Sequence, residues 1–313
     1  MGVKKHNNAE NSNAMSLFSA RRAAPSVLLT LLSMFLVMLL AACATSQGDG
    51  SGSNVSNVPS LGSTATTPQF AATNLKHYPA GTADLSWNSG DQKLVVKITL
   101  SGLAPNSSHA AHIHAGTCAA DGRVVYPLNP VVADAKGNAT VETTLEHVQN
   151  GIPAQGWYVN VHNGLAATPL EHRAISCGNI SNPDASNSAA QSVHVVMGGT
   201  TAPNESASGK VELITVNEKP AVKITLTGLQ PDSTHVAHIH SGSCQAQGAV
   251  LVMLNPVVAD AHGTGTSITE VDHLPSVSNG LYVNVHLGAT VAELSNSIFF
   301  NPIACGNISA NQT

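Results

Sequence analysis

Short segments of apolar and polar residues, separated by turn residues, follow one another along the chain from about residue 80 onward. Residues 94–100 begin as a continuous apolar run and then alternate, which is typical of a strand in a β-sandwich. A cluster of turn residues follows at 101–106. Further strands are expected at residues 141–145 and 157–162. Few segments longer than ten residues carry an apolar stripe of helical period, so the pattern predicts an all-β fold.

The same order of strands and turns occurs twice. Residues 97–137 align without a gap with residues 223–263, and length changes appear only in later loops. A Ser-, Asn- and Ala-rich stretch separates the two copies. The sequence therefore predicts two tandem antiparallel β-sandwiches. Their expected bounds are 71–181 and 193–310, with a linker at 182–192.

Each repeat contains a histidine-rich strand at the same position. It reads His-x-x-His-x-His and starts at His109 in the first repeat and at His235 in the second. Residues two apart in a strand face the same side, about 6.6 Å apart, so the last two histidines present their rings together. A third histidine ends the strand Val-Asn-Val-His of each repeat. Three imidazoles with an open position suit copper, with zinc as an alternative. The candidate ligands are His112, His114, His162, His238, His240 and His286.

The remaining histidines are expected to lie at the surface. His147 and His273 each follow an acidic residue, with a fourth metal ligand or a proton shuttle as the alternative role. His6, His77, His172, His194 and His262 have no counterpart in the other repeat.

Charge and cysteine content narrow the class of protein. Charged residues make up 10% of the chain, the net charge is −5, and no basic cluster follows the extreme N-terminus. A nucleic-acid partner is therefore not expected. Four of the five cysteines fall two to a repeat. In an exported chain, paired cysteines favour disulfides over buried free thiols, which are the alternative.

The N-terminal segment predicts export. Basic residues precede an apolar run at 27–42, which ends in Leu-Ala-Ala-Cys43. This ending resembles the lipobox of bacterial lipoproteins, in which the cysteine is lipidated and becomes the first mature residue. Residues 1–43 are then a signal peptide, with Met15 as an alternative start. A plain membrane-spanning anchor is the other interpretation, although about 16 apolar residues are few for one. Residues 44–70 are rich in Gly, Ser, Thr and Asn, which predicts a flexible tether.

Several short motifs together resemble Cu/Zn superoxide dismutase. They are Gly102-Leu103, the His-x-x-His-x-His strand, Gly-x-Cys118, Val132-x-Asp134-x-x-Gly137, Val-His162 and Cys177-Gly-x-Ile, and they recur in the second repeat. The segment Tyr158-Val-Asn-Val-His162 is also similar to the CHRD module, a β-sandwich relative found in secreted proteins.

The resemblance implies roles for particular residues. It implies Greek-key sandwiches in which the six candidate histidines bind copper, whereas His109 and His235 tie the strand to a loop. It also implies the disulfides Cys118–Cys177 and Cys244–Cys305. The long zinc loop is missing and the zinc-binding Asp would fall at Pro127 and Met253, so no zinc is expected there. The anion-guiding Arg of the dismutases has no equivalent in the second repeat, and in the first Arg173 is one residue away.

Three functions follow from these observations. The first is a membrane-anchored, extracytoplasmic, copper-binding protein of superoxide dismutase-like type, with at most weak dismutase activity and with superoxide as the small ligand. The second is a copper-buffering protein without turnover. The third is a CHRD-like structural or binding module without metal. The sequence leaves open whether the chain is an enzyme, and it does not identify a protein partner.

Overall fold

The structure is a computed structural model that describes residues 72–186, 188–275 and 280–309. The expected signal peptide, Cys43 and the tether lie outside these residues. Within them, no helix is both long enough and apolar enough to span a membrane. Nearly all regular structure is antiparallel strand, and the helical segments in this part of the chain are short, at Glu293–Ser295 (η2) and Ser297–Phe300 (α1). The predicted all-β fold is confirmed.

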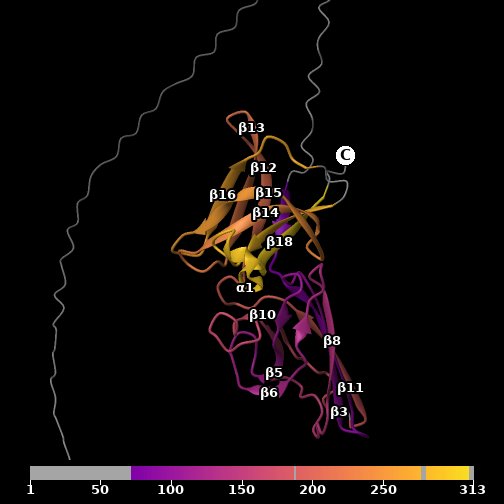
Figure 1. The fold of residues 1–313 in the computed structure, drawn as a ribbon. Helices are drawn as coiled ribbons and strands as arrows, with labels where there is room; N and C mark the ends of the chain where they lie inside the picture. Colours follow the sequence, from indigo (N-terminus) through magenta and orange to yellow (C-terminus); the bar gives the residue numbers. More distant parts are fainter. Residues whose placement is uncertain (1–71, 187, 276–279, 310–313) are drawn as a thin grey trace, which may run out of the picture. The chain divides into compact units, whose positions relative to one another are not determined.

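The first sandwich consists of two four-stranded sheets and a two-stranded pair (Figure 1). One sheet has the order β11 (Ala190–Met197), β2 (Ala80–Asn88), β3 (Lys93–Ser101) and β8 (Ala139–Leu145). The second sheet has the order β10 (Ala174–Asn179), β9 (Trp157–His162), β5 (Ala111–Ala115) and β6 (Val124–Pro127). The pair joins β4 (Ser108–His109) to β7 (Val131–Val132).

The second sandwich is one continuous sheet of eight strands. Its order is β1 (Ala72–Leu75), β12 (Ser208–Val216), β13 (Lys219–Thr227), β16 (Gly265–Glu270), β15 (Ala246–Ala259), β14 (Thr234–Ser243), β17 (Leu281–His286) and β18 (Pro302–Ile308). Between β15 and β16 the ladder has only the pairs Val258↔Thr266 and Ala259↔Gly265. The two halves of the sheet are therefore joined at β15 and β16 by only a short stretch of backbone pairing.

Alternation along the strands builds two separate cores. In β3, Leu94, Val96, Ile98 and Leu100 are buried, whereas Lys97 and Thr99 between them are exposed. In β5 and β9 the same rule buries Ile113, Val159 and Val161 in the first core and turns the histidines to the other face. The histidines therefore lie on the outer face of the sheet, where loops cover them.

The two sandwiches exchange their first strands. β1 precedes the first sandwich in sequence but pairs with β12, and its Leu75 belongs to the second core. β11 precedes the second sandwich but pairs with β2 over all eight of its residues, and it belongs to the same sheet as β3 and β8 (Figure 1). The expected boundary at residue 192 falls inside β11. A strand's alternation shows that one face is buried, but it does not show which sheet the strand joins.

Isolated bridges fix the point at which each exchanged strand crosses. Lys76 pairs with Cys305, and Gly198 pairs with Cys177. In both pairs the backbone N–H groups and carbonyls of the two residues bond one another, at 2.7 to 3.0 Å. Lys76 and Gly198 are therefore equivalent positions of the two repeats.

Candidate metal sites

The first histidine triad lies on the outer face of β5 and β9. His112, His114 and His162 each offer one nitrogen, and these nitrogens lie within 4.8 Å of one another. Nδ1 of His112 donates a hydrogen bond to Nε2 of His162 at 3.1 Å. Two nitrogens bound to one ion at about 2.0 to 2.1 Å lie about 3 Å apart, so this pair already has the spacing of ligands on a shared ion.

Backbone carbonyls set the tautomers of this triad. Nδ1 of His162 donates to the carbonyl of His172 at 2.6 Å, and Nδ1 of His114 donates to that of Gly122 at 2.9 Å. The proton on Nδ1 leaves a lone pair on each Nε2. Metal-ligating histidines are typically held in this way, with the second ring nitrogen bonded to a carbonyl or carboxylate.

The second triad repeats this arrangement with deeper burial. Nδ1 of His240 donates to Gly248 at 3.1 Å, and Nδ1 of His286 donates to Phe300 at 2.6 Å. Nε2 of both rings, and both nitrogens of His238, are buried without a hydrogen-bond partner among the described residues. A buried polar atom without a partner costs about 1 to 3 kcal/mol, so these nitrogens are suited to a ligand that the protein itself does not supply.

Burial favours the uncharged form of three triad histidines, His162, His238 and His286. It lowers the pKa of His162 to about 4 and that of His238 to about 4. The pKa of His286, which has no exposed surface, falls to about 3 for the same reason. Neutral imidazoles are the form that binds a metal ion, so no proton has to be removed before binding at pH 7.

Aromatic rings and two further histidines support the triads. Tyr158 stacks on His114 with ring centroids 5.0 Å apart, and Tyr282 stacks on His240 at 4.9 Å. His109 donates from Nδ1 to the carbonyl of His162 at 2.9 Å, and His235 does the same to His286 at 3.0 Å. Each of these bonds ties the triad strand to the strand that supplies the third ligand.

Both expected disulfides are present, as Cys118–Cys177 and Cys244–Cys305, with Cα atoms 5.9 Å apart in each. Each anchors the loop that follows the histidine strand. The carbonyls that orient His114 and His240 come from Gly122, which lies in that loop, and from Gly248, which lies near the start of β15. Each disulfide is thus connected to its triad through one short segment. Two structural disulfides are typical of an extracellular or secreted protein.

A family model for the CHRD domain matches residues 57–167 and 186–291, well over half of the chain. The protein belongs to the CHRD domain family. Both CHRD matches contain a complete histidine triad, whereas Cys177 and Cys305 lie beyond their ends. No curated protein is similar enough to this chain to count as a match.

Each CHRD repeat also places an asparagine beside its triad. Asn160 and Asn284 stand two residues before the third histidine and share its face of the strand. Nδ2 of Asn160 is 3.5 Å from Nε2 of His162, and the side-chain oxygen has no partner among the described residues. Neither side-chain polar atom of Asn284 has one. The Val-Asn-Val-His pattern of both repeats already places this asparagine on the face of the histidine, but the prediction from the sequence used only the histidine.

One histidine expected at the surface is not free there. The side chain of His77 is 8% exposed, and its Nε2 bonds the carbonyl of Ile175 at 2.8 Å. It is buried because it follows the exchanged strand β1. His172 is exposed, as expected, and its ring stacks on His162 with centroids 4.6 Å apart. His147 and His273 are exposed, as expected, and belong to neither triad.

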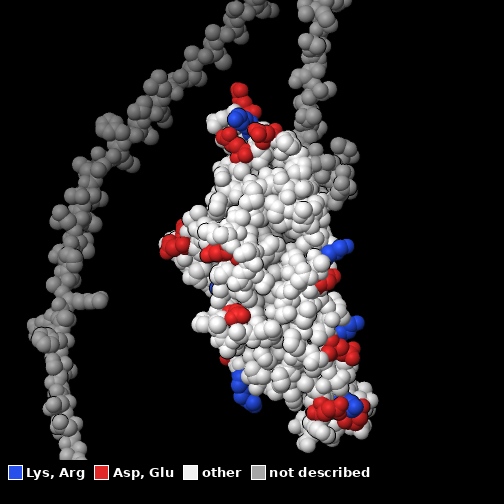
Figure 2. All heavy atoms as spheres, viewed as in Figure 1, with Lys and Arg blue, Asp and Glu red and all other residues white. Residues whose placement is uncertain are grey.

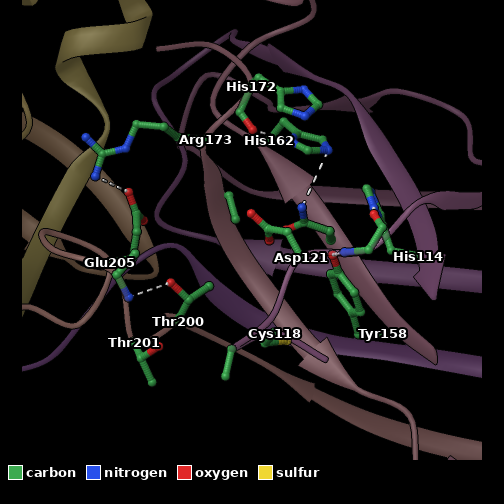
Figure 3. A pocket seen from close by; sticks show the side chains of 15 residues that line it. His114, Cys118, Asp121, Tyr158, His162, His172, Arg173, Thr200, Thr201 and Glu205 are labelled. Atoms are coloured by element: carbon green, nitrogen blue, oxygen red, sulfur yellow. Dashed lines mark hydrogen bonds and ion pairs between the residues drawn. The ribbon is translucent and has the colours of Figure 1, made fainter. Parts of the chain in front are cut away.

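Arg173 lies close to the first triad but is bound to another group. Its Nη2 is 3.2 Å from a carboxylate oxygen of Glu205 and donates to the carbonyl of Pro203 at 2.7 Å. Glu205 is buried, which raises its pKa to about 7, although Arg173 acts in the opposite direction. Both residues line a cavity of about 310 Å³ beside the triad. Figure 3 shows His114 and His162 on one side of this cavity and Arg173, Glu205 and Thr200 on the other.

Proposed function

We propose that this CHRD protein binds copper at two three-histidine sites, one in each repeat, and works outside the cytoplasm at a membrane surface. The observation that carries the proposal is the convergence of unprotonated nitrogens. In each triad two rings donate a hydrogen bond from Nδ1 to a backbone carbonyl, which leaves the Nε2 lone pair for a ligand. These nitrogens are buried and lie within 4.8 Å of one another.

The chemistry of the donors favours copper over hard cations. Each triad consists of imidazoles alone, whereas magnesium and calcium prefer oxygen ligands. Among the divalent first-row metals, copper binds nitrogen sites most tightly, and zinc is the next candidate. Bound copper would supply one-electron redox chemistry. The residues around it hold the rings and fix their tautomers.

Metal content after copper loading tests the proposal. The parent chain is expected to hold two equivalents by elemental analysis. His112→Ala and His238→Ala should each remove one equivalent, because two remaining imidazoles are too few to retain the ion. His147→Ala and His273→Ala are matched controls, since these exposed histidines belong to neither triad. If the parent binds no copper, or the triad variants bind as much as the parent, the chain is better described as a metal-free CHRD module.

Weak superoxide dismutase activity is a second candidate, favoured by the cavity beside the first triad, which gives a small ligand space near His162. The pairing of Arg173 with Glu205 limits it, because a neutralised guanidinium attracts anions poorly. Superoxide turnover by the copper-loaded chain should exceed that of an equal concentration of free copper. Turnover no higher than that of free copper would leave copper holding as the function.

Anchoring through Cys43 completes the proposal and rests on the lipobox-like sequence before it. Cys43→Ala should release the protein from membranes or block removal of the signal peptide. The measurement is fractionation together with mass spectrometry of the N-terminal peptide. An unmodified N-terminus in a membrane-bound parent would indicate a spanning anchor.

A further inference from the structure

The two triads are alike in their ligands but differ in what covers them. Two positions of the covering shell can be matched between the repeats through their backbone contacts. His172 and Phe300 are equivalent, because their carbonyls accept the Nδ1 proton of His162 and His286 respectively. Thr200 and Tyr78 are equivalent, because each stands two residues beyond the bridge residue, Gly198 or Lys76.

The cover of the first triad is small and polar. Thr200, His172 and the Arg173–Glu205 pair line the cavity of about 310 Å³, which also reaches His114 and His162. Thr200 and Glu205 come from the segment after β11, so the strand exchange brings the wall of this cavity from the second repeat (Figure 3). A water molecule occupies about 30 Å³ in the liquid, so the cavity has room for a ligand of several atoms.

The cover of the second triad is aromatic. Tyr78 packs against Tyr282 and the disulfide cysteines Cys244 and Cys305, and its hydroxyl accepts a hydrogen bond from Gln245. The ring of Phe300 lies on His286 with centroids 4.7 Å apart. All three ligand residues of this triad are buried, whereas His112 of the first triad is half-buried. Tyr78 therefore packs on Tyr282, which stacks on His240, at the position where Thr200 lines the cavity of the first triad.

We infer that the first triad exchanges small ligands with solvent through this cavity, whereas Tyr78 and Phe300 close the second triad. The inference rests on the proposed metal function. It adds that the two sites differ in whether a ligand from solvent can reach the metal. A ligand of a few atoms, such as a small inorganic anion, reaches the metal of the first site. The second site holds its metal without a place for such a ligand.

Azide binding to copper-loaded chains that keep one triad tests this inference. His238→Ala leaves the first site and His112→Ala leaves the second. Azide is titrated by its charge-transfer absorption with copper(II). The first site is expected to bind azide at least tenfold more tightly than the second. Equal affinities at the two sites would overturn the inference.

Exchanging the covering residues adds a sharper test. Thr200→Tyr in the first-site chain should weaken azide binding at least tenfold, and Thr200→Val should leave it unchanged. Tyr78→Ala in the second-site chain should create azide binding, and Tyr78→Phe should not. Thermal unfolding of each variant shows whether it is folded. If folded Thr200→Tyr and Tyr78→Ala chains both behave like their parents, these residues do not control access.

A measurement without metal separates this inference from the proposed function. Diethyl pyrocarbonate modifies unprotonated imidazole nitrogens, and peptide mass spectrometry locates the modification in the metal-free full chain. His114 and His162 should be modified at least tenfold faster than His240 and His286. A chain that shows this difference but binds no copper would refute the metal function alone. Equal rates would refute the difference in access, whatever the metal content.

Discussion

Removing β11 from the first sandwich should unfold it, although most of β11 lies beyond the expected linker. The perturbation compares two fragments of similar length. Residues 72–181 follow the boundaries expected from the sequence and lack β11, whereas residues 80–198 omit β1 and keep β11. Every buried residue of the first core lies between Ala83 and Met197. The fragment 80–198 therefore contains the whole core, and the fragment 72–181 does not.

The size of the effect follows from the inward face of β11. Val193, Val195 and Met197 are buried in the first core. Full burial of each such side chain contributes about 1.5 to 3 kcal/mol, so the three together contribute about 5 to 9 kcal/mol. The fragment also loses the ladder between β11 and β2. Since a domain is stable by only about 5 to 15 kcal/mol, the loss is as large as the total stability.

Far-UV circular dichroism during thermal and urea unfolding is the assay. The fragment 80–198 should unfold cooperatively, and the fragment 72–181 should show no transition. Neighbouring residues of the full chain give a matched control, because Val195 is 2% exposed and Val196 is 75% exposed. Val195→Asp should lower the unfolding free energy by several kcal/mol, and Val196→Asp by less than about 0.5 kcal/mol. A fragment 72–181 as stable as 80–198 would refute the strand exchange.

Three further predictions concern the triads and their surroundings. Reducing both disulfides should weaken copper retention against a chelator at least tenfold, because the segments that orient His114 and His240 lose their anchor. Unchanged retention would contradict the connection between the disulfides and the triads. The metal-free chain should lose stability as the pH falls from 6.5 towards 4. In that range the unfolded state binds protons that buried His162, His238 and His286 do not, at a cost of up to about 2 kcal/mol for each at pH 5. Urea unfolding at pH 5 and 7 measures this difference. The raised pKa of Glu205 acts in the opposite direction, because the folded state holds its proton more tightly, but it is one group against three histidines. Arg173→Ala should lower the melting temperature because it leaves the Glu205 carboxylate buried without its cation, and adding Glu205→Gln should restore part of the loss. If Glu205→Gln restores none of the lost melting temperature, Arg173 does not stabilise the protein through its ion pair with Glu205.

The strand pattern and both triads could be predicted from the sequence because they depend on local periodicity. Alternation with a period of two decides which residues of a strand share a face, and it holds whichever partner the strand finds. It therefore placed the two histidines of β5 on one face, and the repeat placed those of β14 in the same way. The third histidine was marked by its matching place at the end of Val-Asn-Val-His in both repeats, whereas the cysteine pairing came from the resemblance to the dismutases. The structure brings those residues together in both repeats.

What surrounds the triads was decided only by the tertiary structure. Thr200, Glu205 and Tyr78 carry no local signal, because each follows an exchanged strand into the surroundings of the other repeat's triad. Thr200 and Glu205 line the cavity beside the first triad, and Tyr78 packs against Tyr282 beside the second. Alternation cannot show this, since β1 and β11 would bury the same residues in either sheet. The partner of Arg173 was hidden for the same reason: Glu205 follows β11, and the crossing of that strand brings its carboxylate to the guanidinium. The sequence by itself identified the candidate ligands, and the exchange of strands determined which residues surround them.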